Sequence, residues 1–387
     1  MSVPPKGTQP RILIHGVSVG EVNAAAPLVD ALATGAPPAD VVVSASTTTG
    51  FRRATEQYGG RNPVVRFPFD LTWMVDRFLD RIDPDAVVLM EQELWPGFLR
   101  RCEARGVPVV LVNARMSKAS FGRYRRLGLL SRRLLRRLAL VVCQSEAYRQ
   151  QFEALGVPPE RTAVVGSLKW DAARPNEGDH RARDLAHDLG IDSTRPLVVA
   201  GSTGPGEEAL LLAGRPEGVQ LLFAPRRPER WDEVALLVPG MPRRSGGNGD
   251  ATTHPAQVFL LDTIGELNEA YRLADAVFVG RSLVPQGGSN PLEPAGLGKP
   301  AVIGPHHENF RDVVDILVAE GGLVVSDDPM AVIRGWMEDA NERNRVAEAA
   351  LATVAAHRGT AERTAARIRE LVGGLSGEPE SMQRPRG

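Results

Sequence analysis

The stretch RILIHGVSVGE, residues 11–21, decides the fold expected for the first half of this chain. Arg11 to His15 form a short apolar run typical of a strand, and Gly16 to Gly20 form a turn of small residues. The spacing of Leu28 and Leu32 then indicates a helix. A strand that leads through a glycine-rich turn into a helix is the usual beginning of a parallel α/β domain, and the N-terminus of that helix favours a bound anion.

The same alternation of apolar runs and helical segments continues along the chain. In the first half, further strands are expected at 41–44, 86–90, 108–112 and 138–143. After the polar, turn-rich segment 173–178 the expected strands are 197–200, 220–224, 257–261, 276–279 and 301–303. Continuous apolar strands separated by helices indicate parallel sheets covered on both faces. We therefore expect an α/β protein of two Rossmann-like, doubly wound domains that face a central ligand cleft.

The length of the chain agrees with two domains, because 387 residues exceed the size at which one hydrophobic core usually stops growing. We expect an N-terminal domain over 1–172, a C-terminal domain over 173–375 and a disordered tail over 376–387. Residues 239–256 contain glycine, proline and polar residues without an apolar period, which predicts a mobile loop.

Composition excludes several classes of protein. The formal net charge of -1 argues against a dedicated nucleic-acid binder. No apolar run approaches the ~18 residues of a membrane-spanning helix, and the N-terminus lacks the apolar core of a signal peptide. Cys102 and Cys143 have neither metal-ligand spacing nor the pattern of a disulfide framework. No metal site is predicted, since Asp83-Pro84-Asp85 precedes its strand and is interpreted as a turn.

Positive charge is concentrated in one stretch. Residues 104–145 contain no Asp or Glu. The basic residues there are Arg105, Arg115, Lys118, Arg123, Arg125, Arg126, Arg132, Arg133, Arg136 and Arg137. Leu127, Leu130, Leu134 and Leu138 recur at helical spacing, which predicts a basic amphipathic helix. Two compatible interpretations follow: a surface helix with its leucines in the core, and a segment that docks on an anionic membrane or a phosphorylated substrate.

Acidic residues follow two expected strands of the first half. Glu21 lies near the first turn of its helix, where it either compensates the helix dipole or serves the site. Glu91 and Glu93 directly follow the strand 86–90, at the end where parallel sheets usually carry active sites. Glu93 also has an alternative role as the cap of a helix that begins near Pro96.

The second half contains three candidate phosphate or sugar contacts. Residues 201–208, GSTGPGEE, have the order of a phosphate cradle but lack the Gly-Lys-Ser/Thr ending of a P-loop. Arg226 follows a strand and can clamp a phosphate with two hydrogen bonds. Glu293 lies near a helix start behind Gly287-Gly288-Ser289, where its carboxylate can accept both hydroxyls of a ribose.

Taken in order, these segments resemble one enzyme family, the 3-deoxy-D-manno-octulosonic acid (Kdo) transferases of lipopolysaccharide synthesis. The matching pieces are HGVSVGE, SASTTTG, EQELWP, LVNARMSKASF, CQSE, VVGSLKWD, AGSTGPGEE, APRRPER, LDTIGEL, VGRSLVPQGGSNPLEP and IGPHHENF, with His357 to Thr360 similar to the C-terminal helix region of the family. ELWP, NARMSKASF and GGSNPLEP are long and distinctive.

The resemblance implies a glycosyltransferase-B fold, an N-terminal acceptor domain and a C-terminal domain that binds the donor CMP-Kdo. It implies inverting transfer of Kdo to a lipid A precursor, with no cofactor beyond the donor and no metal, at the cytoplasmic face of the inner membrane. The family's general base corresponds to Glu21, and its residues for transition-state stabilisation correspond to Glu91 and Lys169. The residues that correspond to its CMP site are Pro225, Arg226, Ile264, Gly265, Glu266, Asn290, Pro291, Leu292 and Glu293.

This sequence departs from the family in four places. Family members usually have a hydrophobic anchoring segment before the first motif, whereas only fourteen residues precede His15 here. Gly204 replaces a His, Arg281 replaces a Gly and Ser289 replaces a His. Because the last three lie in the donor half, transfer of another ulosonic or nucleotide-activated sugar is the alternative activity. A non-catalytic protein that binds a nucleotide sugar or lipid is the alternative from another class.

Overall fold

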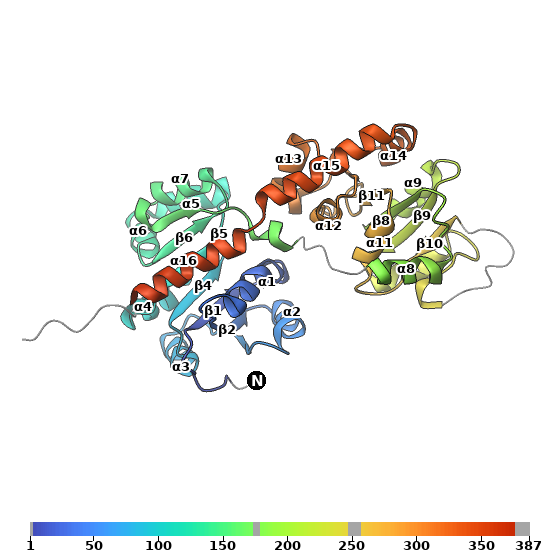
Figure 1. Cartoon of the computed structure of the whole chain (residues 1–387). Coiled ribbons are helices and arrows are strands. Elements are labelled where there is room, and N and C mark those ends of the chain that lie inside the picture. Colours follow the sequence, from blue (N-terminus) through green and yellow to red (C-terminus); the bar gives the residue numbers. More distant parts are fainter. Residues whose placement is uncertain (1–2, 173–178, 247–256, 376–387) are drawn as a thin grey trace, which may run out of the picture. The chain divides into compact units, whose positions relative to one another are not determined.

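The computed structural model describes residues 3–172, 179–246 and 257–375, and within them the chain forms two compact units (Figure 1). The first unit comprises 1–172 together with 357–387, and the second comprises 173–356. The predicted linker 173–178, most of the predicted loop and the predicted tail lie outside the described residues.

The first unit is built on a seven-stranded sheet in the order β3-β2-β1-β4-β5-β6-β7. All its paired strands are parallel. The strands are β1 Arg11–Gly16, β2 Asp40–Ala45, β3 Val64–Arg66, β4 Ala86–Met90, β5 Val109–Ala114, β6 Leu140–Cys143 and β7 Thr162–Val164. The helices are α1 Val19–Thr34, α2 Thr48–Tyr58, α3 Thr72–Ile82, α4 Pro96–Ala104, α5 Lys118–Leu127, α6 Leu129–Leu135, α7 Glu146–Ala154 and α16 Thr360–Leu375, with the short turns η1 Pro159–Arg161 and η2 Leu168–Ala172.

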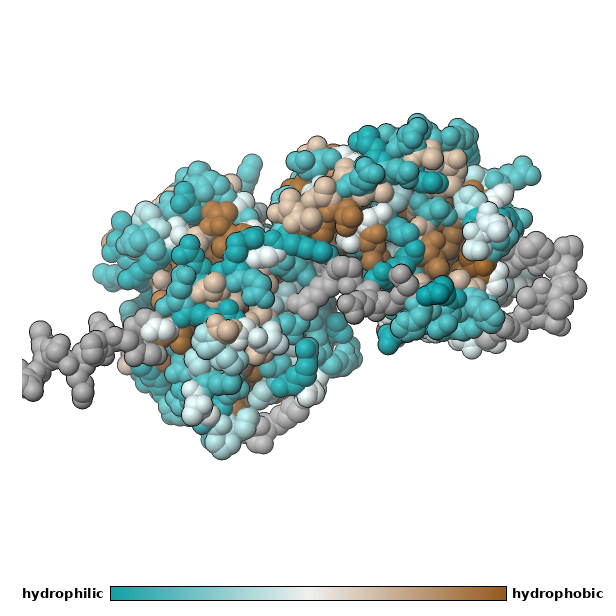
Figure 2. Space-filling view, viewed as in Figure 1, coloured by the Kyte–Doolittle hydropathy of each residue, from teal (hydrophilic) through white to brown (hydrophobic). Residues whose placement is uncertain are grey.

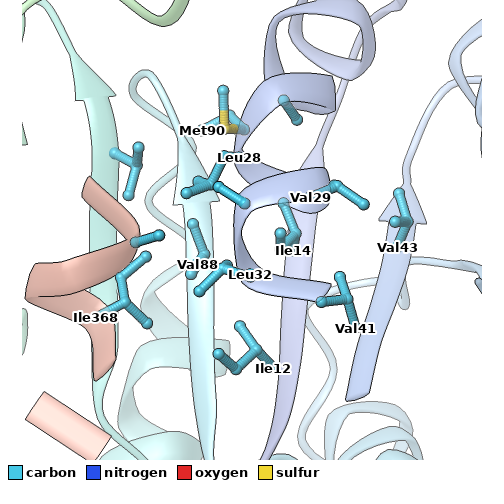
Figure 3. Packing of buried hydrophobic residues seen from close by; sticks show 14 of the residues in the cluster. Ile12, Ile14, Leu28, Val29, Leu32, Val41, Val43, Val88, Met90 and Ile368 are labelled. Carbon is cyan, nitrogen blue, oxygen red and sulfur yellow. The ribbon is translucent and has the colours of Figure 1, made fainter. Parts of the chain in front are cut away.

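Alternating apolar side chains explain why this sheet is buried on both faces. Ile12 and Ile14 of β1 point into one hydrophobic cluster, whereas Leu13 points into a second cluster on the other face. Figure 3 shows Leu28 and Leu32 of α1 packed over β1 and β4, with Ile368 of α16 in the same cluster. The five strands predicted for this half are therefore confirmed, and helices cover both faces. The short edge strands β3 and β7 were not predicted.

The last helix belongs to the first unit, which corrects the expected domain boundary at 375. The predicted boundary at 172/173 holds, but α16 packs against α1 and buries Ala365 and Ile368 in the cluster of the first sheet. Asp171 accepts hydrogen bonds from the backbone N–H groups of Gly359 and Ala361, both at 2.6 Å, at the start of α16. The apolar face of α16 gave no indication in the sequence of which sheet it would cover.

The second unit carries a six-stranded sheet in the order β10-β9-β8-β11-β12-β13, again parallel. Its strands are β8 Leu197–Thr203, β9 Gln220–Pro225, β10 Val258–Leu260, β11 Ala276–Val279, β12 Ala301–Ile303 and β13 Val324–Val325. Its helices are α8 Asp179–Leu189, α9 Glu207–Gly214, α10 Trp231–Ala235, α11 Leu267–Leu273, α12 Leu292–Gly296, α13 Arg311–Ala319, α14 Pro329–Glu338 and α15 Ala340–His357, with the short turns η3 Pro228–Arg230, η4 Arg244–Gly246 and η5 Glu308–Phe310.

Part of the predicted loop 239–256 is anchored rather than unattached. Arg243 pairs with Asp262 at 2.8 Å, and Arg244 pairs with Glu266 at 2.9 Å and with Asp188. These ion pairs hold η4 to the sheet edge. Residues 247–256 lie outside the described residues.

The basic stretch forms two helices instead of one amphipathic helix. Gly128 adopts a φ of 53°, which ends α5 and lets α6 begin in a new direction. Leu138 is buried as predicted, but Leu127 and Leu130 are 55% and 68% exposed. The interpretation that places all four leucines in the core is therefore wrong for the two at the corner. Among the described residues, none of the helices combines the length and apolar character that a membrane span requires.

Candidate functional site

The carboxyl ends of β1, β4 and β5 gather the candidate residues of the first unit. β1 and β4 are neighbours in the sheet, and the helices that follow them pack in different hydrophobic clusters on opposite faces. Open α/β sheets bind their ligands at such a switch point, because the loops diverge there. The predicted residues Glu21 and Glu91 come from these two loops.

Glu21 is held in the first turn of α1 by hydrogen bonds to the residues that precede the helix. Its Oε2 accepts a hydrogen bond from the Val17 N–H at 2.9 Å, and its Oε1 accepts one from the Ser18 hydroxyl at 2.9 Å. Burial raises the pKa of this carboxyl; the two hydrogen bonds lower it, and the charge of Glu91 raises it again. Both interpretations of Glu21 fit, because a carboxylate has lone pairs beyond the two engaged in capping.

Glu91 occupies a strained position directly after β4. Its φ is 56°, a left-handed value that L-residues rarely adopt, and its backbone N–H donates to the Val112 carbonyl at 2.9 Å. The side chain, 17% exposed, accepts a hydrogen bond from Arg115 Nε at 2.8 Å. Arg115 comes from the end of β5, so this ion pair joins the β4 and β5 loops at the site.

Glu93 is a third carboxylate of the same edge. Burial raises its pKa, and the nearby charge of Glu21 raises it further. The prediction that Glu93 caps α4 is wrong: Asp70 accepts the hydrogen bonds of the Gly97 and Phe98 N–H groups, at 2.8 and 2.6 Å. Glu93 is therefore left for the site, where its charge and that of Glu21 disfavour each other.

Lys169 lies on the turn η2, at the end of the segment 1–172 of the first unit. It is half-buried there, and the turn packs against α1. The Leu168 N–H donates to Asn113 Oδ1 at 3.1 Å, and this bond fixes the turn to the end of β5. Trp170 stacks on His357 with ring centroids 4.6 Å apart, so the C-terminal segment also holds the turn in place.

His15 has a structural role at the site and stays uncharged at neutral pH. Its imidazole is buried, stacks on Phe67 at 3.8 Å between centroids and contacts the Ser44 hydroxyl at 3.0 Å. Burial lowers the pKa of His15 to about 3, so the ring is neutral at neutral pH. This histidine holds the end of β1 against an aromatic cluster.

In the second unit, a buried carboxylate ties together the loops that follow β8 and β11. Glu207 is fully buried at the start of α9. Its Oε2 accepts hydrogen bonds from the N–H groups of Gly204 and Arg281, at 2.7 and 2.6 Å. Its Oε1 accepts them from Ser282 and Leu283, at 2.7 and 2.8 Å. The turn after β11 is thus built around Glu207, a role that sequence analysis missed although Glu207 lies within the quoted GSTGPGEE.

The arginines of the basic segment after β9 differ in their contacts: one is paired within the core and two are free to bind a ligand. Arg230 forms two hydrogen bonds with the buried Glu208, at 2.7 and 2.9 Å, and is committed to the core. Arg226 and Arg227 are exposed and form no ion pair within the described part of the chain. The structure therefore leaves the predicted phosphate ligand Arg226 available.

Glu293 lies at the start of α12 and is electrostatically coupled to Arg226. Burial raises the pKa of the Glu293 carboxyl, and the charge of Arg226 lowers it. Asn290 Nδ2 donates to Glu293 Oε1 at 3.1 Å, while Asn290 Oδ1 accepts the Leu292 N–H at 3.1 Å. The segment Asn290 to Glu293 is thus a preformed turn at the start of α12.

The predicted segment Ile264–Gly265–Glu266 follows β10 at the same edge of the sheet. Ile264 is 82% exposed and Gly265 has a φ of 96°, so a ligand can approach the backbone there. The carboxylate of Glu266 is already engaged by Arg244 and by the Thr263 hydroxyl. The structure therefore favours contact through the backbone and the Ile264 side chain over contact through this carboxylate.

All predicted site residues thus lie at the carboxyl edges of two sheets, three in the first unit and nine in the second. The described residues contain no group of three or more His, Cys, Asp or Glu with the geometry of a metal site, and Cys102 and Cys143 are free and buried. Two charged residues of the sites were missed. Arg115 and Glu207 both lie inside motifs quoted from the sequence, but no spacing rule indicated their partners.

Comparisons with known proteins agree with this arrangement. A family model described as 3-deoxy-D-manno-octulosonic-acid transferase (kdotransferase) matches residues 1–172. The 3-deoxy-D-manno-octulosonic acid transferase of Bordetella pertussis is 34% identical over 385 residues, which cover 94% of this chain and 87% of that protein. The enzyme of the same name from Haemophilus influenzae is 31% identical over 375 residues, which cover 93% of this chain and 86% of that protein.

Solved structures with the same fold are more distant. The crystal structure of HepE from Anabaena with UDP has 16% sequence identity and a TM-score of 0.60, covering 94% of this chain and 100% of that chain. UDP-GlcNAc 2-epimerase from Neisseria meningitidis has 12% identity and a TM-score of 0.56, covering 94% and 100%. These similarities establish the fold, two parallel-sheet α/β domains of the glycosyltransferase-B type. By its sequence relatives, the chain belongs to the family of 3-deoxy-D-manno-octulosonic acid transferases.

Proposed function

We propose that this protein transfers Kdo from CMP-Kdo to a glucosamine hydroxyl of a lipid A precursor, with inversion at the anomeric carbon. The observation that carries the proposal is the pairing of two sites in a chain of this family. The first unit holds Glu21 in a carboxylate group, and the second holds Arg226 beside Glu293. A proton acceptor and an anion site are what transfer from a nucleotide sugar to an alcohol requires.

The step balances as a direct displacement. The acceptor oxygen attacks the anomeric carbon of Kdo, and its proton passes to the Glu21 carboxylate. The bond from that carbon to the phosphate oxygen breaks, and CMP leaves with the electron pair. A carboxylate with a raised pKa suits this role, because a stronger base accepts the proton more readily. The Glu91–Arg115 pair and Lys169 supply charges near the reacting atoms.

CMP is a leaving group with a single phosphate, and cationic side chains can balance it. Arg226 is placed to hold that phosphate, while the carboxylate of Glu293 accepts ribose hydroxyls and the turn 264–266 bounds the base. In this proposal the donor needs no metal ion or further cofactor. The donor half contains Gly204, Arg281 and Ser289 at its departures from the family, so transfer of another nucleotide-activated sugar is the second candidate.

The reaction itself is the test. Purified protein is incubated with a lipid A precursor and CMP-Kdo formed in the same vessel, and the lipid is analysed by mass spectrometry. We expect a lipid product that is heavier by one or more Kdo residues. In calorimetric titrations we expect the protein to bind CMP more tightly than UDP or GDP. Tight binding of UDP with none of CMP would overturn the donor assignment, and binding of the precursor without any transfer would favour a non-catalytic protein.

We further infer a peripheral contact with the anionic inner membrane, where the acceptor resides. The corner between α5 and α6 supports this contact. Leu127, Leu129 and Leu130 are 55%, 71% and 68% exposed. On the face seen in Figure 2, by comparison, polar residues cover most of each unit and apolar residues form small separate patches. Exposed leucines gain free energy when they enter the interface between headgroups and acyl chains.

The arginines around this corner are available for anionic headgroups. Arg125, Arg126, Arg132 and Arg133 are exposed and form no ion pair within the described residues, whereas Arg137 is paired with Glu103 at 2.8 Å. Each cation near an anionic surface contributes about 1 kcal/mol. A few such residues therefore suffice for reversible binding.

Vesicle sedimentation tests this contact. We expect wild-type protein to bind anionic vesicles at low salt and to dissociate as salt rises, because screening shortens the reach of exposed charges. Replacing Arg125, Arg126, Arg132 and Arg133 by Glu abolishes the binding while CMP affinity stays unchanged. Equal binding of wild-type protein to neutral and anionic vesicles would contradict the electrostatic mechanism.

A further inference from the structure

A positively charged cavity of about 390 Å³ lies entirely within the second unit, at the ends of β8, β9 and β11. Among the residues that line it are Gly204, Arg226, Arg227, Arg281 and Gln286. Two of these, Gly204 and Arg281, are positions at which the resemblance implies a departure from the family pattern.

The cavity brings three cations together without neutralising them. Arg226, Arg227 and Arg281 form no ion pair within the described residues, and the charges of Arg226 and Arg227, together with burial, lower the pKa of the Arg281 guanidinium. Arg230, also in the lining, is neutralised by the buried Glu208. The lining carboxylate Glu229 is exposed and forms no ion pair in the described chain, so it leaves the excess of positive charge in place. Such a cluster is stabilised by a bound anion.

The backbone of Arg281 adopts a conformation that is unfavourable for a residue with a side chain. Its φ is 60°, a left-handed value normally left to glycine, and its backbone N–H donates to the buried Glu207 at 2.6 Å. The guanidinium donates from Nε to Gln286 Oε1 at 3.3 Å and from Nη2 to the Gln286 carbonyl at 2.9 Å. Nη1 makes no hydrogen bond within the described residues, so the group is oriented and still has donors to offer.

Gly204 provides the space that the Arg281 side chain occupies. A Cβ atom at position 204 would lie 3.4 Å from Arg281 Cγ and 3.2 Å from both Gln286 Oε1 and Val284 Cγ2. A larger residue at 204 would therefore displace the Arg281–Gln286 pair. Gly204 and Arg281 thus form one structural exchange, in which the missing side chain at 204 leaves room for the cation at 281.

We propose that Arg281 is a donor-specificity residue that binds the carboxylate of the transferred ulosonic acid, with Gly204 as the space that admits it. This inference rests on the proposed function. An activated ulosonic acid carries two anions on one carbon, its own carboxylate and the phosphate of CMP. In this assignment Arg226, at the end of β9, takes the phosphate. Arg281 comes from a separate loop of the same cavity and takes the second anion.

The test separates the two anions by comparing CMP, which has only the phosphate, with CMP-Kdo, which has both. Arg281→Gly suits the fold because glycine favours the observed φ, and Arg281→Lys keeps the charge. For Arg281→Gly we expect kcat/KM for the donor to fall about 10- to 100-fold, the scale of a charge-assisted hydrogen bond. We expect the CMP Kd to change less than about 3-fold on the same scale. Arg281→Lys retains part of the donor kcat/KM, and Arg334→Gln, on the exposed face of α14, serves as the matched control.

Two outcomes overturn the proposal. An equal loss in CMP affinity and donor kcat/KM makes Arg281 a phosphate ligand, and wild-type values for both make it a structural residue only. The double variant Gly204→His/Arg281→Gly adds a second measurement, because the proposed exchange predicts that Gly204→His costs less donor kcat/KM without Arg281 than with it. Simple multiplication of the two single effects contradicts the exchange. Failure of wild-type protein to use CMP-Kdo at all would count against the proposed function instead.

Discussion

The two units use the same edge of the same kind of sheet for opposite charges. In the first unit, Glu21, Glu91 and Glu93 gather at the ends of β1 and β4, with Arg115 paired to one of them. In the second, Arg226, Arg227 and Arg281 lie at the ends of β9 and β11. The buried carboxylate of Glu207 accepts hydrogen bonds from backbone N–H groups there and does not neutralise these cations. This difference fits the proposed function, in which the first unit accepts a proton and the second holds the anionic donor.

Backbone strain follows the same edge in both units. Among the described residues, five non-glycine residues have a positive φ: Asp83, Glu91, Asn113, Ser202 and Arg281. Asp83 is simply the left-handed cap that ends α3. The other four lie at or just after the ends of β4, β5, β8 and β11, where loops turn sharply beside the candidate sites. Strain of this kind persists where the surrounding structure fixes it, and it clusters at functional sites.

The largest effect we expect comes from removing the base in the first unit. Glu21→Gln keeps the size of the side chain and the capping acceptor but cannot take a proton. Turnover should fall about 10²–10⁴-fold, the usual loss when a general base is removed. Single-turnover kinetics with CMP-Kdo measure this, and Glu56→Gln, on the exposed face of α2, is the control. A Glu21→Gln enzyme with full rate would place the base elsewhere, with Glu93 the next candidate.

The next largest effect concerns the anchor of the second unit. Glu207→Gln is nearly isosteric but points an amide N–H₂ group at backbone N–H donors that now bind a carboxylate. Because buried donors without acceptors are costly, we expect the free energy of unfolding of this unit to fall by about 3 kcal/mol. Urea denaturation followed by tryptophan fluorescence measures it, with the exposed Glu217→Gln as control. An unchanged midpoint would show that the turn after β11 does not depend on Glu207.

A smaller effect is expected in the pH dependence. Burial raises the pKa of Glu21 above its ordinary value of 4.5. A base works only when deprotonated, so kcat/KM should decrease as pH falls through this raised pKa, at a higher pH than for an exposed glutamate. The acid limb of the pH profile is the measurement. A limb at or below the ordinary value would mean that the base is not buried in this way.

The strands and most of the site were predictable from the sequence for a physical reason. Apolar runs such as Ala86 to Met90 have one stable solution, a strand covered on both faces, and parallel strands bring their following loops to one edge. That argument predicted the positions of Glu21, Glu91 and Arg226 in the segments that follow β1, β4 and β9; their roles stay predictions. It does not apply to a helix such as α16, whose apolar face could cover either sheet. The hydrogen bond to Asp171 and the burial of Ile368 attach this helix to the first sheet.

Contacts that depend on exact backbone geometry were the other part that the sequence did not predict. Gly128 breaks the basic helix, because a left-handed turn there redirects α6 and leaves Leu129 and Leu130 exposed. The four hydrogen bonds of Glu207 come from two loops that are more than 70 residues apart in the chain. No local pattern encodes a partnership of that kind.

The division of labour between the two units is tested most directly by CMP binding in variants of each unit. Calorimetric titration of CMP is performed on wild-type protein, on Glu21→Gln/Glu91→Gln and on Arg226→Ala. We predict an unchanged CMP Kd for the double carboxylate variant and a loss of about 10-fold or more for Arg226→Ala, because a charge-assisted phosphate contact is removed. A double carboxylate variant that loses CMP affinity while Arg226→Ala retains it would contradict the account.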